Sequence, residues 1–160
     1  MKKCGIKGDE LSDKNLKTLT DIMNENGHAD SDNLILKMDI EGAEWRALLD
    51  TPSSILFRFS QIVVEVHAVV SRCSGDAYSV MVYFFKHMNK DHQIVHVHAN
   101  NFGGVAIFGG VFVPDVFEIT WVRRRDHEFS ECFKVFPTDL DMPNNPKFPD
   151  IFLGALGAIA

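Results

Sequence analysis

The stretch that decides the fold of this chain is Leu34-Ile35-Leu36-Lys37-Met38-Asp39-Ile40-Glu41-Gly42-Ala43-Glu44-Trp45. An apolar run leads directly into three carboxylates around one glycine, and then into a helix. An unpaired carboxylate taken out of water costs several kcal/mol or more, so a buried strand does not normally contain one. We therefore place Asp39, Glu41 and Glu44 where the strand ends, at the carboxyl edge of a sheet, which is where open α/β sheets bind their ligands.

Helical and extended patterns alternate on both sides of this stretch. Helices are predicted between Ser12 and Gly27, from Glu44 to Leu49 and from Asp76 to Met88, and strands over Leu34–Ile40, Gln61–His67, Gln93–His98 and Val116–Val122. Such alternation favours an α/β fold with a mostly parallel sheet and helices on both faces. The last two strands are joined without a clear helix, so one of them should run antiparallel.

The composition argues against a nucleic-acid partner. The chain of 160 residues is 46% hydrophobic and has a net charge of −6, whereas nucleic-acid-binding domains usually show a basic stripe. The cluster Arg123-Arg124-Arg125 is followed at once by Asp126 and Glu128, so we interpret it as a solvated strand end. Thirteen Phe against two Tyr predict a dry, aromatic-rich core.

The cysteines and the chain ends carry little sign of secretion or membrane insertion. Cys4, Cys73 and Cys132 are widely spaced and form no CxxC pair, so neither a zinc site nor a disulfide framework is indicated, and a cytoplasmic location is favoured. Met1-Lys2-Lys3 precedes a polar region, not an apolar signal core. The apolar end Ile151–Ala160 is far shorter than the roughly 20 residues that span a bilayer.

Three predicted strand ends bring polar side chains to one edge of the sheet. These side chains are Asp39, Glu41 and Glu44 from the first strand, Glu65 and His67 from the second, and His96, His98, Asn100 and Asn101 from the third. Together they could orient a substrate hydroxyl, serve as a general base or ligate a hard divalent cation. The alternative is that they cap helices and tie loops, as Asp and Asn often do.

Taken singly, these residues differ in what they indicate. A carboxylate at Glu44 also suits the first turn of a helix, so a purely structural role is equally open. Glu65 interrupts the apolar run Val63–Val66 and should therefore have a specific partner. His67 and His96 fit either a ligand or a hydrogen-bonded scaffold. The glycines at 103, 104, 109 and 110 match no phosphate-binding fingerprint and predict a flexible turn.

The segment LILKMDIEGAEW closely resembles the hallmark of FkbM-type methyltransferases, in which a strand ends in a (K)xDxEGxE pattern before a helix. The segments QIVVEVH, HVHANN and VPDVFEITWVRR also look similar and follow in the right order. The resemblance covers roughly Leu16 to Arg124. It is closest to the methyltransferase-like branch of the family.

The resemblance implies a Rossmann-like methyltransferase fold that uses S-adenosylmethionine, acting on an oxygen of a small-molecule, sugar or lipid acceptor. It implies three groups of site residues, and no metal site: Asp39, Glu65 and His67 as catalytic residues, Asp39, Glu41 and Gly42 at the cofactor, and Glu44, His96, Asn100 and Asn101 at the substrate.

The chain departs from the family pattern at its start. The glycine-rich turn after the first strand and the acidic residue that grips the ribose are both absent. We therefore expect residues 1–160 to form one partial domain, the C-terminal half of the fold without its first strands, with a loop-rich tail over residues 137–160. The strand from Leu34 would then be an exposed apolar edge that invites a homo-oligomer.

Two rival functions stay open. Beside a methyltransferase, which could be inactive in this truncated form, the chain could be a non-catalytic remnant that acts in protein assembly, or a metal-dependent hydrolase that uses Asp39, Glu65, His67 and His96.

Overall fold

The computed structural model describes residues 5–6 and 16–155. Its helices are α1 (Leu19–Glu25), α2 (Glu44–Leu49), α3 (Ser53–Leu56) and α4 (Gly75–Met88), with the 3₁₀ turns η1 (Val70–Arg72) and η2 (Arg124–Asp126). Its strands are β1 (Gly5–Ile6), β2 (Leu16–Lys17), β3 (Leu34–Met38), β4 (Phe59–Val66), β5 (His92–Ala99), β6 (Val105–Phe108), β7 (Val111–Pro114), β8 (Phe117–Arg123), β9 (Val135–Phe136) and β10 (Gly154–Ala155).

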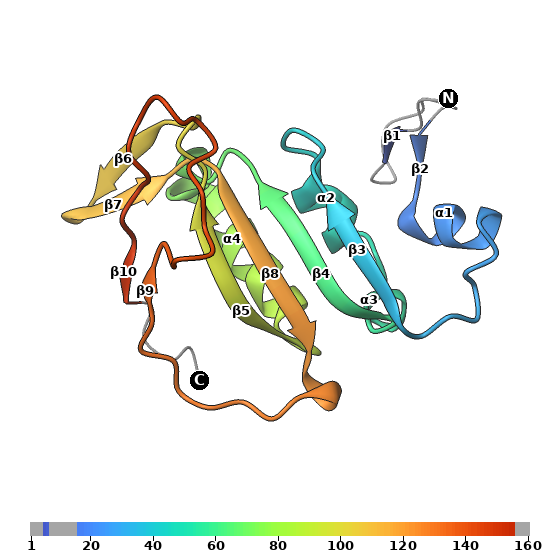
Figure 1. Cartoon of the computed structure of the whole chain (residues 1–160). Coiled ribbons are helices and arrows are strands. Elements are labelled where there is room, and N and C mark those ends of the chain that lie inside the picture. Colours follow the sequence, from blue (N-terminus) through green and yellow to red (C-terminus); the bar gives the residue numbers. More distant parts are fainter. Residues whose placement is uncertain (1–4, 7–15, 156–160) are drawn as a thin grey trace.

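The main sheet has four strands in the order β3-β4-β8-β5 (Figure 1). Strand β3 pairs in parallel with β4, and β8 lies antiparallel between β4 and β5. Strands β3, β4 and β5 therefore run in one direction and end at the same edge of the sheet. This confirms the predicted mixed α/β fold, and β8 is the predicted antiparallel strand.

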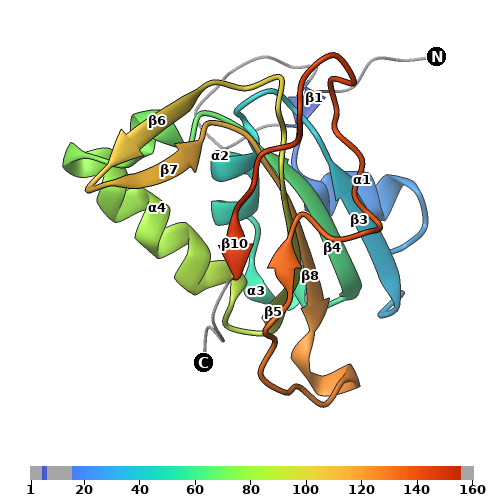
Figure 2. The same cartoon turned by 60° about the vertical axis from the view of Figure 1, so that its left-hand side comes forward.

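Helices α2 and α4 cover one face of the sheet, and the C-terminal tail crosses the other face over β8 and β5 (Figures 1 and 2). The burial of β4 alternates along the strand, with Ile62, Val64 and Val66 fully buried. Trp121 of β8 packs edge-on against Phe84 of α4. The prediction of helices on both faces is wrong for β8 and β5, where irregular chain takes the place of a helix.

The tail is attached to the sheet by polar contacts. The Asn101 side chain accepts a hydrogen bond from the backbone of Asn145 at 2.7 Å and donates to the Asn145 carbonyl at 3.1 Å. His98 Nε2 lies 3.0 Å from Asp150 and its Nδ1 lies 3.2 Å from Glu118. His98 is almost fully buried and contacts both the tail and β8, so it connects the tail to the sheet.

We expect the docking of the tail to weaken as the pH rises. Burial alone would lower the pKa of His98, but hydrogen bonds with Asp150 and Glu118 outweigh burial and raise it above its usual value. A raised pKa in the folded state means that the stabilisation is complete below the unfolded value of about 6.5 and is lost as the pH passes the folded value. Amide exchange of residues 137–153, corrected for the intrinsic rate, should therefore increase between about pH 6 and pH 9.

The control for this expectation is His98→Gln, which keeps hydrogen-bonding atoms but does not titrate. The variant should show the same corrected exchange at both pH values. An equal rise in the variant would mean that another group controls the tail.

Strands β6 and β7 form a separate hairpin that the sequence analysis predicted only as a flexible turn. Gly109 and Gly110 make its turn with φ of 57° and 85°, a region that favours glycine. Its apolar side chains Ile107 and Phe112 are 64% and 65% exposed. No helix in the described part of the chain combines the length and apolarity needed to cross a membrane.

Two further predictions are corrected by the structure. Helix α1 begins at Leu19, where Thr18 and Asp21 form a capping box; Leu16 belongs to β2, and the predicted cap Ser12 lies outside the described residues. The aromatic core is smaller than predicted, since many phenylalanines lie on the hairpin and the tail, where little covers them. The exposed ones are Phe102, Phe108, Phe112, Phe129, Phe133, Phe148 and Phe152.

Strand β3 is the edge of the main sheet, with β4 as its one strand partner among the described residues. Ile35 on this strand is 68% exposed. Among the described residues β3 is thus an edge strand with one exposed apolar side chain, Ile35, while Leu36 and Met38 are buried; its pairing with a second copy of the chain stays a prediction.

Candidate functional site

The loop between β3 and α2 carries the acidic motif to the carboxyl edge of the sheet. Asp39 follows β3 directly, and Glu41 and Gly42 turn the chain with φ of 56° and 100°. Positive φ is rare for a residue other than glycine, so Glu41 is held in a strained conformation by its surroundings. The turn leaves the Glu41 side chain 87% exposed and directs the chain into α2.

Glu44, the first residue of α2, is completely buried. Its carboxylate accepts hydrogen bonds from the backbone N–H of Gly42 at 2.9 Å and of His67 at 2.6 Å. One of its oxygens also lies 3.1 Å from His67 Nδ1. Glu44 therefore holds the acidic loop and the end of β4 together and orients the imidazole. In this geometry Glu44 positions Gly42 and His67. A direct contact of Glu44 with a substrate stays a prediction.

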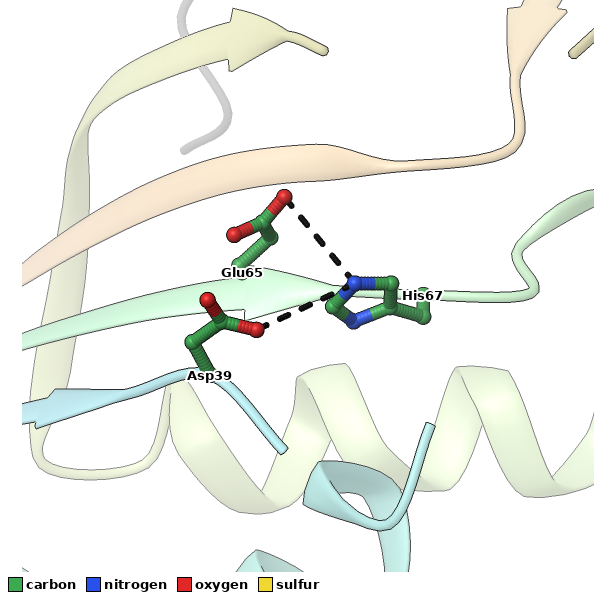
Figure 3. A group of neighbouring side chains, drawn as sticks. All are labelled: Asp39, Glu65 and His67. Atoms are coloured by element: carbon green, nitrogen blue, oxygen red, sulfur yellow. Dashed lines mark ion pairs between the residues drawn. The ribbon is translucent and has the colours of Figure 1, made fainter. Parts of the chain in front are cut away.

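Asp39, Glu65 and His67 converge at the ends of β3 and β4, as Figure 3 shows. His67 Nε2 lies 3.9 Å from Asp39 Oδ1 and 3.9 Å from Glu65 Oε1, and Glu41 Oε2 lies 3.6 Å from the same nitrogen. The Asp39 side chain is 43% exposed, whereas those of Glu65 and His67 are 14% and 16% exposed. The group is thus partly sheltered and open on the side of Asp39. We call Asp39, Glu65 and His67 the edge cluster.

Glu65 has the specific partner that its place in an apolar run predicts. Asn100, which follows β5, donates a hydrogen bond to Glu65 Oε1 at 2.6 Å, and its own oxygen accepts from the Phe102 N–H at 2.8 Å. Burial raises the pKa of Glu65 above its usual value, and the Asp39 carboxylate raises it further against the opposite effect of Asn100. Polar groups from β4 and β5 therefore meet, as the strand-end argument predicts.

His96 and Asn101 lie outside the edge cluster. His96 Nε2 is 2.7 Å from Asp141 Oδ1, and its ring packs edge-on against Phe136 at 5.3 Å between centroids. Asn101 is engaged by the tail. Both residues therefore tie the tail to the sheet, and their contact with a substrate stays a prediction.

Glu118 lies beside Glu65 of the edge cluster, and the sequence did not single it out. It pairs in register with Glu65 on one side and with His98 on the other, so the three share one face of the sheet. Its carboxylate accepts a hydrogen bond from Asn144 at 2.8 Å. The alternation of polar and apolar residues in β8 marks Glu118 as facing away from the core, but only the pairing with β4 places it beside Glu65.

A family comparison bears on this site directly. A family model described as "Methyltransferase FkbM domain" matches residues 7–97, which is more than half of the chain. The chain belongs to the FkbM methyltransferase family. The matched range includes the whole acidic loop and the edge cluster and ends before Asn100. No curated protein and no solved structure matched the chain.

Membership in the FkbM family confirms the resemblance drawn from the sequence. It indicates a methyltransferase in general terms, and FkbM methyltransferases generally use S-adenosylmethionine. Within the matched range, the edge cluster is the group of described residues in which carboxylate and imidazole atoms lie close enough together to share one ligand.

Proposed function

We propose that this chain is an S-adenosylmethionine-dependent methyltransferase with a Rossmann-like sheet that transfers a methyl group to an oxygen acceptor. The family match supports the reaction class, and the edge cluster is the observation that supports a site at the ends of β3 and β4. The acceptor belongs to a class with a free hydroxyl, such as a sugar, a lipid or a small metabolite.

The residues at this edge suit the charge of the cofactor. S-adenosylmethionine supplies an electrophilic methyl group on a positively charged sulfur and also carries an ammonium group. Asp39 and Glu41 present carboxylates on the open side of the site, and Gly42 lets the backbone approach closely. These three residues would hold the cofactor.

The acceptor hydroxyl must lose its proton as the new bond to the methyl carbon forms. Asp39, Glu65 and His67 are the groups of the edge cluster that can accept this proton. Glu65 is held by Asn100 and His67 by Glu44, so both are fixed in place before an acceptor binds. Holding the acceptor oxygen in line with the methyl group supplies a large share of the rate in such transfers.

Calorimetric titration with S-adenosylhomocysteine tests this proposal. We expect saturable heat for the wild-type chain and a binding constant weakened by about tenfold or more in Asp39→Asn, since about 1.4 kcal/mol of lost interaction corresponds to tenfold. Methyl transfer from labelled S-adenosylmethionine to a panel of hydroxyl acceptors should be lost in the same variant.

The matched control is Asp76→Asn, which removes one exposed carboxylate from the first turn of α4. Asp76→Asn should bind S-adenosylhomocysteine as the wild type does. If the wild-type chain gives no heat, the proposal fails; if Asp39→Asn binds and transfers normally, the assignment of Asp39 fails.

A further inference from the structure

The edge cluster has the spacing of ligands around a shared ion. The Nε2 of His67 is 3.9 Å from an oxygen of Asp39 and from an oxygen of Glu65, too far for hydrogen bonds. Two ligand atoms about 2.1 Å from one ion lie roughly 3.0 Å apart at right angles and roughly 4.2 Å apart when opposite. Both separations from His67 fall between these values, and the ligand atoms of all three side chains lie within 4.8 Å of one another, so the three can surround one ion.

The imidazole of His67 is oriented as metal-binding imidazoles usually are. Its Nδ1 donates to the fully buried carboxylate of Glu44 at 3.1 Å, which leaves the lone pair on Nε2 facing Asp39 and Glu65. A carboxylate behind the ring is the usual arrangement that fixes the tautomer of a metal-bound histidine. Glu44 lies outside the edge cluster, so this is an observation independent of the spacing.

Negative charge exceeds positive charge around His67. Asp39, Glu41, Glu44 and Glu65 all lie within 4 Å of its ring nitrogens, and His67 supplies at most one positive charge. Within the residues that the structure describes, these carboxylates form ion pairs with no lysine or arginine. Close like charges are costly when part of the group is sheltered from water, and a divalent ion removes that cost.

We propose that Asp39, Glu65 and His67 bind a divalent cation of the Mg²⁺ or Mn²⁺ class. Carboxylate oxygens suit these hard ions, and a single imidazole is compatible with Mn²⁺. Three protein ligands leave other positions of the ion for water or for substrate oxygens. The binding of the cation stands on geometry and charge, whereas its use in the reaction rests on the proposed function. The ion would bind the acceptor hydroxyl and lower the pKa of that hydroxyl, and a carboxylate oxygen of Asp39 or Glu65 that does not contact the ion would accept the released proton.

Mn²⁺ titration of the metal-stripped full chain, followed by electron paramagnetic resonance, tests the site. We expect one Mn²⁺ per chain, with Mg²⁺ competing for the same site. Asp39→Asn and His67→Gln should each weaken Mn²⁺ binding by about tenfold or more. The matched controls Asp76→Asn and His127→Gln replace exposed residues of the same types and should bind Mn²⁺ as the wild type does.

A measurement on the wild-type chain keeps the test independent of how the variants fold. Bound Mn²⁺ should broaden the ring signals of His67 in nuclear magnetic resonance spectra at concentrations that leave those of His127 sharp. Equal broadening of both rings, no Mn²⁺ bound at millimolar concentration, or binding of Zn²⁺ alone would each overturn the proposal.

Failure of this site and failure of the proposed function give different results. If the wild-type chain binds S-adenosylhomocysteine but no Mn²⁺, the proposed cation site is wrong and the proposed methyltransferase function stands. If the wild-type chain binds Mn²⁺ but not S-adenosylhomocysteine, the cation site stands and its proposed use in methyl transfer is wrong.

Discussion

Replacing Glu44 with alanine should lower the free energy of unfolding by about 3–5 kcal/mol, because a buried carboxylate that accepts three hydrogen bonds is removed. The N–H groups of Gly42 and His67 would then be left without their acceptor, next to a small cavity. For a chain of this length, such a loss lowers the melting temperature by about 10 °C. Urea unfolding followed by circular dichroism measures the change.

The control for Glu44 is Asp76→Ala, since Asp76 occupies the first turn of α4 as Glu44 occupies that of α2. Asp76 is exposed, and an exposed carboxylate at this position contributes about 0.3–1 kcal/mol through the helix dipole. If both alanine variants lose the same small amount, Glu44 has no more than a dipole effect and its contacts with Gly42 and His67 contribute nothing.

Glu44→Gln separates the effect on His67 from the effect on folding. The amide keeps the shape and one acceptor, but its NH₂ group would face the donor at Gly42, so a smaller loss of stability is expected. The ring of His67 should then lose its fixed tautomer whenever the amide turns. Chemical shifts of the ring nitrogens in nitrogen-15 spectra report the tautomer, and an unchanged tautomer in Glu44→Gln would contradict the positioning role.

The second large effect is expected at Arg123. Its guanidinium is 3% exposed and donates to the carbonyls of Asp32 and Phe57 at 2.6 and 2.7 Å and to the Asp126 carboxylate at 2.7 Å. Arg123→Met keeps the apolar stem and removes all three bonds, which should cost about 3 kcal/mol of unfolding free energy. The hydrogen bond from Arg123 holds the pKa of Asp126 below its usual value, so that pKa should rise in the variant.

Arg125→Met is the matched control for Arg123. The Arg125 side chain is 45% exposed and pairs with Asp32 and Asp126 at the surface. Exposed ion pairs contribute about 0–1 kcal/mol, so this variant should unfold close to the wild type. Equal losses in the two variants would mean that the burial of Arg123 has no energetic consequence.

Arg123 also shows where sequence reasoning reaches its limit. Three consecutive arginines followed by acidic residues are typical of a solvated strand end, and that interpretation holds for the exposed Arg124 and Arg125. It is wrong for Arg123, which continues the inward face of β8 after Ile119 and Trp121. The carbonyls that pair with Arg123 come from residues far away in the sequence, so charge patterning alone does not find them.

The strands of the main sheet were predictable because β3, β4 and β8 are rich in apolar or β-branched residues, and β5 alternates polar and apolar residues. The predicted strand over Gln61–His67 overlaps β4, and the predicted helix from Glu44 to Leu49 has the bounds of α2. The hairpin was missed because β6 and β7 are only four residues each and flank glycines that suggest irregular chain. Such short strands carry a weak pattern in the sequence.

The candidate site was predictable in part. Asp39 follows an apolar run and Glu65 stands near the end of another, so the sequence places both carboxylates near the ends of strands at one edge of the sheet. The direction of each side chain was not predictable, because it depends on contacts across the sheet. Glu44 turns inward to His67, and His96 turns to Asp141 on the tail.

The position of β8 has a consequence for how the chain is completed during synthesis. It is the last strand of the main sheet to be translated, and it lies between β4 and β5, hydrogen-bonded to both. Until residue 123 has left the ribosome, β4 and β5 have no bridge between them, and their inner edges have no partner. The sheet therefore closes through long-range pairing only after its other three strands have been made, a route that favours slow folding over local, stepwise assembly.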